Sequence, residues 1–228
     1  MSRRPRAPEQ RTIARMFDEI VPTYDRLNAL MSGGQDRRWR KLAAGELGTR
    51  GGRVLDLGCG TGRLGDLLSG DNLVVGVDVS AGMLAEARRS AGGRLLLVSG
   101  SAFALPFRSG AFDGLASAFA LRNLDDLAVA FSECARVLRP GGRIALIDVT
   151  EPPNRAWRVL FDTYFKAAAP LLGRIVGHRD AYSYLPRSLI HLPPAPEVVG
   201  LLETAGFTGV RTVPRLGGAV TLWSAVRR

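Results

Sequence analysis

The chain has 228 residues, which is enough for one α/β domain with a full core and short for two. Its formal net charge is +10, from 31 Lys and Arg against 21 Asp and Glu. Such a charge suits nucleic acid, an anionic membrane surface or a solvated arginine-rich exterior. Because the basic residues are dispersed and no nucleic-acid-binding module is recognisable among them, we expect no nucleic-acid partner.

Hydropathy and cysteine content restrict the class of protein further. No apolar run approaches the ~18 residues of a transmembrane helix. The basic N-terminus is not followed by the apolar segment of a signal peptide, so we expect a cytoplasmic protein. Cys59 and Cys134 are too few for a disulfide framework, and we expect both to be reduced packing residues. With His178 and His191 as the only histidines, no metal-ligand set is visible, and we predict no metal.

Helices are expected at the N-terminus. The apolar residues Ile13, Phe17 and Ile20 have helical spacing, which Pro22 interrupts, so the pattern predicts short helices here. A further helix is expected from Asp36, with an apolar side that includes Trp39 and with the basic residues 37, 38, 40 and 41 spread around the rest.

Residues 53–62, RVLDLGCGTG, couple a short apolar strand to a glycine-rich turn. Three glycines in five residues let a ligand approach the backbone, and a helix starting near Thr61 would direct its free N–H groups at that ligand. A dinucleotide fingerprint requires glycine where Arg63 stands, which counts against NAD or FAD. The spacing D-x-G-x-G-x-G, starting at Asp56, resembles the first motif of class I methyltransferases that use S-adenosylmethionine (SAM).

A second buried strand, Leu73 to Val77, ends at Asp78. A carboxylate at the carboxyl end of this strand is placed to accept hydrogen bonds from both hydroxyls of an adenosine ribose. The alternative role of Asp78, capping the next helix, is open to Ser80 instead.

The remaining elements continue the alternation of strand and helix. A third strand, Leu95 to Val98, leads to a turn at Ser101 and Ala102 that should lie beside the adenine. A fourth strand, Phe112 to Ala118, leads through Leu121, Arg122 and Asn123 to a helix from about Asp125. A fifth strand covers Arg143 to Val149, and two more, about Val210–Pro214 and Ala219–Val226, follow a helix that begins at Pro196. We therefore predict an α/β fold with a mainly parallel, doubly covered sheet.

An inserted helical segment precedes the sixth strand. Trp157, Leu160, Phe161, Tyr164 and Phe165 form an apolar stripe that ends before Pro170. We expect one domain over residues 1–228, made of N-terminal helices (1–50), a ligand-binding core (53–149), a helical lid (152–192) and a C-terminal helix with two strands (194–228).

Several motifs together resemble the menaquinone and ubiquinone biosynthesis C-methyltransferase family, the demethylmenaquinone methyltransferases. These are VLDLGCGTG, GVDVS, FALRNL and RVLRPGGRI. FDEIVPTYDRLNALMSGGQDRRWRKL is similar to the family's N-terminal signature, and DAYSYLPRSLIHLPPAPEVVGLLETAGFTGV to its C-terminal stretch. The resemblance covers roughly positions 10 to 226. It implies a seven-stranded Rossmann-like sheet with the last strand antiparallel, and methyl transfer from SAM to a ring carbon of a prenylated naphthoquinol.

The resemblance also assigns residues to the SAM site. Asp78 would hold the ribose, and Ser101 with Ala102 the adenine edge. The full set that it implies is Asp56, Gly58, Gly60, Thr61, Gly62, Asp78, Ser101, Ala102 and Ala118. The chain departs from the family pattern at Ser101, where Asn or Asp is common, at Ala118, where serine is expected, and at Ala120, where glycine is usual.

Arg122 and Asn123 are the predicted catalytic residues. A quinol carbon becomes nucleophilic when the neighbouring hydroxyl, with a pKa near ~10, loses its proton. Arg122 stays protonated, so it would hold the phenolate or polarise a water, and Asn123 would orient that water or a quinone oxygen. The structural alternatives are a surface arginine and a helix-capping asparagine. Tyr24, Tyr182 and Tyr184 are predicted lid residues that contact the substrate ring.

A substrate with an isoprenoid tail is dissolved in the bilayer. The positive charge of the chain would favour its approach to an anionic bilayer surface. The stripe from Trp157 to Phe165 has the character of an interfacial helix for peripheral contact with an anionic membrane surface, and equally of a lid on the protein's own core. Alternative acceptors are a benzoquinol precursor of ubiquinone and a soluble phenolic or polyketide-like ring. A nucleic-acid methyltransferase would need an N-P-P-Y-like motif where FALRNL stands, and a non-catalytic SAM-binding protein would bind without turnover. The sequence is compatible with a homodimer but does not give the oligomeric state.

Overall fold

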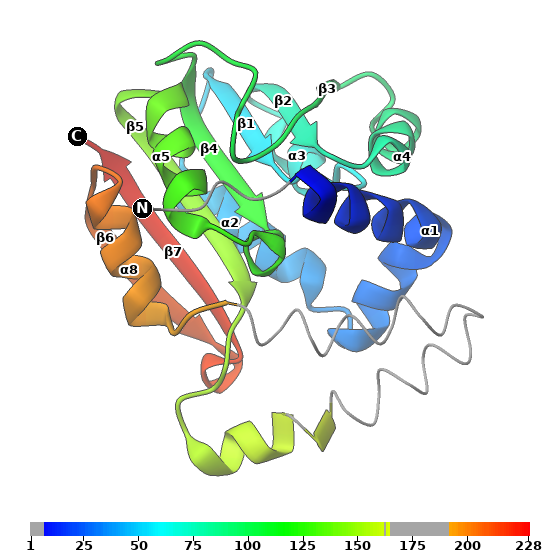
Figure 1. The fold of residues 1–228 in the computed structure, drawn as a ribbon, viewed down its shortest axis with the longest axis vertical. Helices are drawn as coiled ribbons and strands as arrows, with labels where there is room; N and C mark the ends of the chain where they lie inside the picture. Colours follow the sequence, from blue (N-terminus) through cyan, green and yellow to red (C-terminus); the bar gives the residue numbers. More distant parts are fainter. Residues whose placement is uncertain (1–6, 162, 165–191) are drawn as a thin grey trace.

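The structure is a computed structural model that describes residues 7–161, 163–164 and 192–228, with side chains from residue 12 onward. Seven strands form one sheet in the order β3-β2-β1-β4-β5-β7-β6 (Figure 1). The strands are β1 (Arg53–Leu57), β2 (Leu73–Asp78), β3 (Leu95–Ser99), β4 (Phe112–Ala118), β5 (Leu138–Val149), β6 (Phe207–Arg215) and β7 (Val220–Arg227). The helices are α1 (Ala7–Met31), α2 (Asp36–Leu47), α3 (Arg63–Leu68), α4 (Ala81–Ala91), α5 (Leu127–Val137) and α8 (Ala195–Thr204), with the short 3₁₀ turns η1 (Leu121–Asn123) and η2 (Leu216–Gly218).

The predicted seven-stranded sheet with its last strand antiparallel is confirmed. β1 to β5 run parallel to one another, and β7 lies antiparallel between β5 and β6. Parallel strands point their carboxyl ends to one edge of the sheet, and the loops after β1, β2, β3 and β4 therefore meet there.

Both faces of the sheet are buried, as the continuous apolar strands predict. Alternate residues of one strand enter two different cores: Leu55 packs with α5 and α8, and Val54 packs with α2 and α3. β5 repeats this pattern with Leu146 on the first face and Ile147 on the second. The strands are therefore fixed from both sides, which makes their carboxyl ends a rigid platform.

The N-terminal prediction was wrong about length. α1 continues through Pro22 as one helix of 25 residues, whereas the sequence predicted short helices interrupted there. Proline removes a helix hydrogen bond, but contacts outside the helix outweigh that loss. Ile20 and Leu27, which lie on either side of Pro22, are both buried in a cluster with Met83 of α4.

Two carboxylates of α1 dock the helix onto the N-termini of α3 and α4. Asp25 accepts hydrogen bonds from the Thr61 hydroxyl and the Arg63 guanidinium, each at 2.9 Å. Asp18 accepts from the Ser80 hydroxyl at 2.5 Å and from the Gly82 N–H at 2.9 Å. A carboxylate at a helix N-terminus is stabilised by the free N–H groups and the helix dipole. α1 consequently lies across the loops at the carboxyl edge of the sheet (Figure 1).

Two element boundaries also differ from prediction. α3 begins at Arg63, not near Thr61, after Gly62 in the left-handed conformation. β5 begins at Leu138, five residues before the predicted start, because residues 139–142 form a bulge between the pairs Phe112–Leu138 and Gly114–Arg143. Gly141, at φ 75°, allows this bulge without ending the strand.

Residues 155–161 and 163–164 are helical and begin the segment predicted as a lid. The Trp157 indole N–H donates to the Leu216 carbonyl at 2.9 Å, and the Tyr164 hydroxyl donates to the Met31 carbonyl at 3.0 Å. The rest of that prediction, including Phe165, Pro170, Tyr182 and Tyr184, lies outside the described residues. Over the part of the chain that is described, no helix is both long and apolar enough to cross a membrane.

Candidate active site

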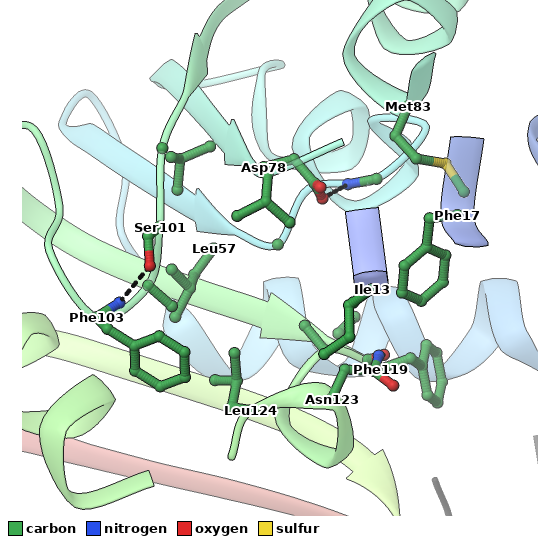
Figure 2. A pocket seen from close by; sticks show the side chains of 18 of the residues that line it. Ile13, Phe17, Leu57, Asp78, Met83, Ser101, Phe103, Phe119, Asn123 and Leu124 are labelled. Carbon is green, nitrogen blue, oxygen red and sulfur yellow. Dashed lines mark hydrogen bonds between the residues drawn. The ribbon is translucent and has the colours of Figure 1, made fainter. Parts of the chain in front are cut away.

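A cavity opens at the carboxyl edge of the sheet, beside the glycine-rich turn (Figure 2). We call it the glycine-loop cavity. Its floor is formed by the ends of the strands and the turns after them, including Gly58, Asp78 and Ser101. Ile13, Phe17 and Tyr24 of α1 contribute the opposite wall. The helix that precedes the sheet in sequence thus covers the site that the sheet builds.

Asp78 links two turns of this cavity. Its Oδ2 accepts the Gly60 N–H at 2.8 Å and its Oδ1 accepts the Ser80 N–H at 2.9 Å. Burial raises the pKa of Asp78, and the two N–H groups partly offset that effect. Ser80 is the N-cap of α4, with its hydroxyl accepting the Met83 N–H, as predicted. Asp78 remains at the cavity wall.

The turn requires glycine at its different positions for different structural reasons. Gly58 and Gly60 line the cavity with φ 64° and 52°, so their backbone faces the open space. A Cβ on Gly58 would lie 2.6 Å from the Cβ of Ala120. Ala120 therefore narrows the cavity, and position 58 opposite it must be glycine. Gly62 does not line the cavity: a Cβ there would press on Leu95 at 3.0 Å, so this glycine permits packing.

The remaining predicted SAM residues divide between two sides of the turn. Ser101, Ala102 and Ala118 line the glycine-loop cavity. Thr61 does not line it; with Asp56 it lines a smaller adjoining hollow that also touches Gly58 and Gly60. The turn at Ser101 is held by its hydroxyl, which accepts the Phe103 N–H at 3.1 Å (Figure 2).

Asp56 is a buried carboxylate under the turn, 1% exposed, and its Oδ2 has no hydrogen-bond partner among the described residues. Burial raises the pKa of Asp56 to about 7; the Gly65 N–H and the charge of Arg40 oppose this, and the charge of Asp78 adds to it. A carboxylate in this state favours a positively charged ligand group, because such a group would compensate the charge that burial penalises.

Arg122 is not a surface residue, which removes one of its two predicted interpretations. It is 8% exposed, and its guanidinium contacts the fully buried Asp148 at 2.6 Å. The Arg122 N–H also donates to Asp148 at 3.1 Å. Asn123 does not cap α5, because Asp126 occupies that position and accepts the Val129 N–H. Asn123 instead lines the glycine-loop cavity, with its amide 3.5 Å from the Phe119 carbonyl.

A second cavity of about 410 Å³ lies beyond Arg122 and is mostly apolar, and we call it the apolar cavity. Met31 of α1, Trp39 of α2 and Trp157 with Phe161 of the lid segment form its walls. Arg122 and Asp36 supply charged groups to the lining. The space suits a flat apolar molecule that carries a polar group at one end.

Phe119 stands between the two cavities and lines both. Its backbone is at φ 63°, a conformation that costs a non-glycine residue on the order of 1–3 kcal/mol. The ring lies 4.9 Å from the Arg40 guanidinium carbon and 5.8 Å from that of Arg122. Strain of this kind persists only where the surroundings hold the residue in place, which is typical of functional sites.

Comparison with known proteins identifies the family. The ubiE/COQ5 methyltransferase family matches residues 5–227. The chain belongs to this family. It is 39% identical over 219 residues to the ubiquinone/menaquinone biosynthesis C-methyltransferase UbiE of Syntrophotalea carbinolica, covering 93% of this chain and 92% of that protein. It is 43% identical over 202 residues to the demethylmenaquinone methyltransferase of Thermus thermophilus, covering 85% and 91%. This ubiE/COQ5 family member is therefore an enzyme, a methyltransferase.

Solved structures agree on the fold of this ubiE/COQ5 family member. The chain matches a SAM-dependent methyltransferase from Thermotoga maritima with a TM-score of 0.66 at 19% identity, over 94% of this chain and 99% of that one. It matches the [4+2]-cyclase SpnF with a TM-score of 0.70 at 20% identity, over 100% and 99%. At such identities the likeness establishes the fold alone.

Several residues at or beside the two cavities were not predicted from the sequence. Arg40 was expected outside, but it is 6% exposed, paired with Asp36 at 2.5 Å. Asp148 lies near the carboxyl end of a predicted strand. A carboxylate among apolar residues at that place could have indicated a site residue, as it did for Asp78. Phe119 gave no signal, since its unusual backbone conformation is invisible in sequence. Tyr24 lines the glycine-loop cavity as expected of a lid residue, and its role stays a prediction.

The raised pKa of Asp56 predicts a pH-dependent stability. Between pH about 4 and about 7 the unfolded carboxyl ionises while the folded one stays protonated, so the free energy of unfolding falls as pH rises through this window, by on the order of 4 kcal/mol. Asp56→Asn removes this dependence, and the variant should exceed the wild type in stability above pH 7. Urea unfolding at several pH values measures the difference.

Asp113→Asn is the control for that measurement. The Arg53 N–H and the Arg139 guanidinium lower the pKa of Asp113, so its contribution is present above the ordinary pKa and is lost as pH falls. The two variants should change the pH dependence in opposite directions. If the difference in the free energy of unfolding between the wild type and Asp56→Asn is constant between pH 4 and 8, the prediction is wrong.

Proposed function

We propose that this enzyme transfers a methyl group from SAM to a ring carbon of a prenylated quinol, and that its acceptor is demethylmenaquinol, converted to menaquinol. The observation that carries the proposal is the apolar cavity next to the glycine-loop cavity, with Arg122 in its lining. One cavity suits a polar nucleoside donor and the other an apolar ring. The names of the similar proteins agree with this acceptor.

The residues around the glycine-loop cavity fit SAM. Asp78 would hold the ribose hydroxyls, the turn at Ser101 and Ala102 the adenine, and Gly58 with Gly60 would let the donor approach the backbone. Asp56, whose Oδ2 has no partner among the described residues, would face the ammonium group of the amino-acid end in the adjoining hollow. When bound, SAM supplies an electrophilic methyl group on a sulfonium. Ile13 and Phe17 of α1 would exclude water from this methyl group.

In the apolar cavity, Arg122 would hold the deprotonated oxygen of the quinol. Its guanidinium is held in place by Asp148. Hydrogen bonds donated by guanidinium N–H groups to the phenolate oxygen would favour the deprotonated form and lower the quinol pKa from ~10. Arg122 itself stays protonated, so the proton leaves to water. Asn123, on the glycine-loop side, would orient that water or a second ring oxygen.

The chain also offers a surface for peripheral contact with an anionic membrane, at the cytoplasmic side. Five exposed apolar side chains, each in the cavity lining or next in sequence to a lining residue, form what we call the apolar rim: Leu30, Val159, Leu160, Tyr164 and Leu216. Three of them, Leu160, Tyr164 and Leu216, also line the cavity. An isoprenoid tail leaving the cavity would pass between them into lipid. The +10 charge of the chain would favour the approach to an anionic leaflet.

A labelling experiment tests the acceptor. Methyl-labelled SAM is offered with reduced demethylmenaquinone, with a demethylated benzoquinol and with a tail-less soluble phenol, each in liposomes and in solution. We expect label on the ring carbon of the naphthoquinol, and the most in liposomes. Labelling of the benzoquinol in preference would favour the ubiquinone precursor, and labelling of a soluble, non-quinoid ring alone would refute the proposal.

Asp78 and Arg122 should affect different kinetic steps. Asp78→Asn removes one acceptor for the ribose and should weaken SAM binding about tenfold or more, measured by titration calorimetry. Arg122→Lys keeps a positive charge beside Asp148 but loses the planar fork, so SAM affinity should change little while kcat falls. Equal losses of SAM affinity in the two variants would contradict this division of roles.

The apolar rim should be required for vesicle binding. Changing Leu30 and Val159 together to Ser removes two rim side chains that do not line the cavity, and should reduce partition into anionic liposomes roughly tenfold in a flotation assay. Leu73 and Leu96, 53% and 54% exposed on the β2 and β3 side of the sheet, changed to Ser form the matched control. If both pairs have the same effect, the rim is not the contact surface.

A further inference from the structure

Phe119 is the one residue, within the described part of the chain, that the two cavities have in common. It follows directly after β4 and is 8% exposed. A methyl group can pass from a donor in one cavity to an acceptor in the other only where the cavities meet. The side chain of Phe119, one of the labelled residues that line the glycine-loop cavity in Figure 2, therefore lies where such a transfer would take place.

The position of the Phe119 ring is fixed from several directions. Its N–H donates to the Ile147 carbonyl at 2.8 Å, which ties its left-handed backbone to β5. The Trp39 ring lies 6.1 Å away, and the guanidinium carbons of Arg40 and Arg122 lie at 4.9 and 5.8 Å.

Both guanidinium groups are themselves fixed. Arg40 contacts Asp36 at 2.5 Å, and Arg122 contacts Asp148 at 2.6 Å. Contact with two anchored cations restricts the tilt of the ring. Phe119 is thus a rigid part of the wall.

The proposed acceptor can be methylated at an oxygen or at a ring carbon, and a rigid wall can determine which of these atoms reacts. A deprotonated quinol is an ambident nucleophile, because its negative charge is shared between the oxygen and the ring carbons ortho and para to the carbon that bears it. The oxygen carries more of the charge, yet the proposed product has a new carbon–carbon bond. Since transfer needs the reacting atoms aligned within ~3–3.5 Å, the site must keep the oxygen out of line with the methyl group.

We propose that Phe119 is the specificity-determining residue that selects the ring carbon over the oxygen, an inference that rests on the proposed function. Arg122 holds the oxygen on the apolar-cavity side, and the Phe119 ring supports the flat face of the acceptor so that the unsubstituted carbon ortho to the oxygen-bearing carbon faces the glycine-loop cavity. The electron pair of this carbon forms the new bond to the methyl group, and the carbon–sulfur pair returns to sulfur, leaving a neutral thioether. The proton on the methylated carbon then passes to water and the ring becomes aromatic again.

The test is the ratio of carbon-methylated to oxygen-methylated product. Phe119→Leu keeps apolar volume but loses the flat ring, and we expect the ratio to fall at least tenfold, equivalent to ~1.4 kcal/mol. We expect SAM affinity by calorimetry to stay within about twofold. Affinity for the oxidised, unreactive naphthoquinone should fall about fivefold, a reading that does not depend on turnover. Phe119→Tyr keeps the ring and should retain the wild-type ratio.

Phe112→Leu is the matched control. Phe112 lies at the other end of β4, is 4% exposed and packs edge-on against Phe107 at 5.0 Å, but it lines neither cavity. It should lower the unfolding temperature and leave the product ratio unchanged. If Phe119→Leu does not fold, Phe119→Met, which is similar in size and flexible, serves for the same measurement.

The outcomes separate this inference from the function on which it rests. Exclusively carbon-methylated product from Phe119→Leu, with unchanged naphthoquinone affinity, would overturn the inference and leave the function standing. A wild-type enzyme that methylates no quinol would overturn both. Equal shifts in product ratio for Phe119→Leu and Phe112→Leu would show that general loosening of the fold decides the ratio, and would also overturn the role of Phe119.

Discussion

The buried ion pair between Arg122 and Asp148 is the contact on which the arrangement of the two cavities depends. It joins the turn after β4 to the end of β5, two segments that meet only because the sheet is parallel. Removing one partner of a buried pair leaves the other charge uncompensated, which typically costs 3–5 kcal/mol. The pair fixes the guanidinium of Arg122 beside the apolar cavity and, through it, one side of the Phe119 ring. The boundary between the two cavities is therefore fixed in part by a buried ion pair.

The donor side of this site follows from local sequence patterns. A strand, a glycine-rich turn and an acidic residue after the next strand are each encoded within a few residues, so Gly58, Gly60 and Asp78 could be placed at one edge before any coordinates. Ser80 as a helix cap is equally local. Thr61 and Gly62 do not line the glycine-loop cavity, because whether a residue of the turn faces the cavity or its back depends on the exact φ and ψ of the turn, and their part in SAM binding stays a prediction.

The acceptor side depends on contacts between distant parts of the chain. Arg40 is buried since α2 packs over the end of β4, which no helical periodicity indicates. α1 continues through Pro22 because Ile20, Leu27 and the two docking carboxylates fix it from outside, so local propensity gave the wrong boundary. Asp148 reads in sequence as the polar end of a strand, and its partner Arg122 lies 26 residues away. Neither composition nor periodicity indicates which residues pair when they are distant in sequence.

The docking of α1 differs in character from the pair at the centre of the site. Asp25 and Arg63 are 25% and 57% exposed, so their attraction passes through water and weakens when salt is added. Asp148 is fully buried, and mobile ions do not reach it. α1 covers the glycine-loop cavity with its middle and lines the apolar cavity with Met31 near its end. α1, which lines both cavities, is thus held partly by a contact that responds to ionic strength, whereas the buried pair of Arg122 and Asp148 is insulated from the composition of the surrounding solution.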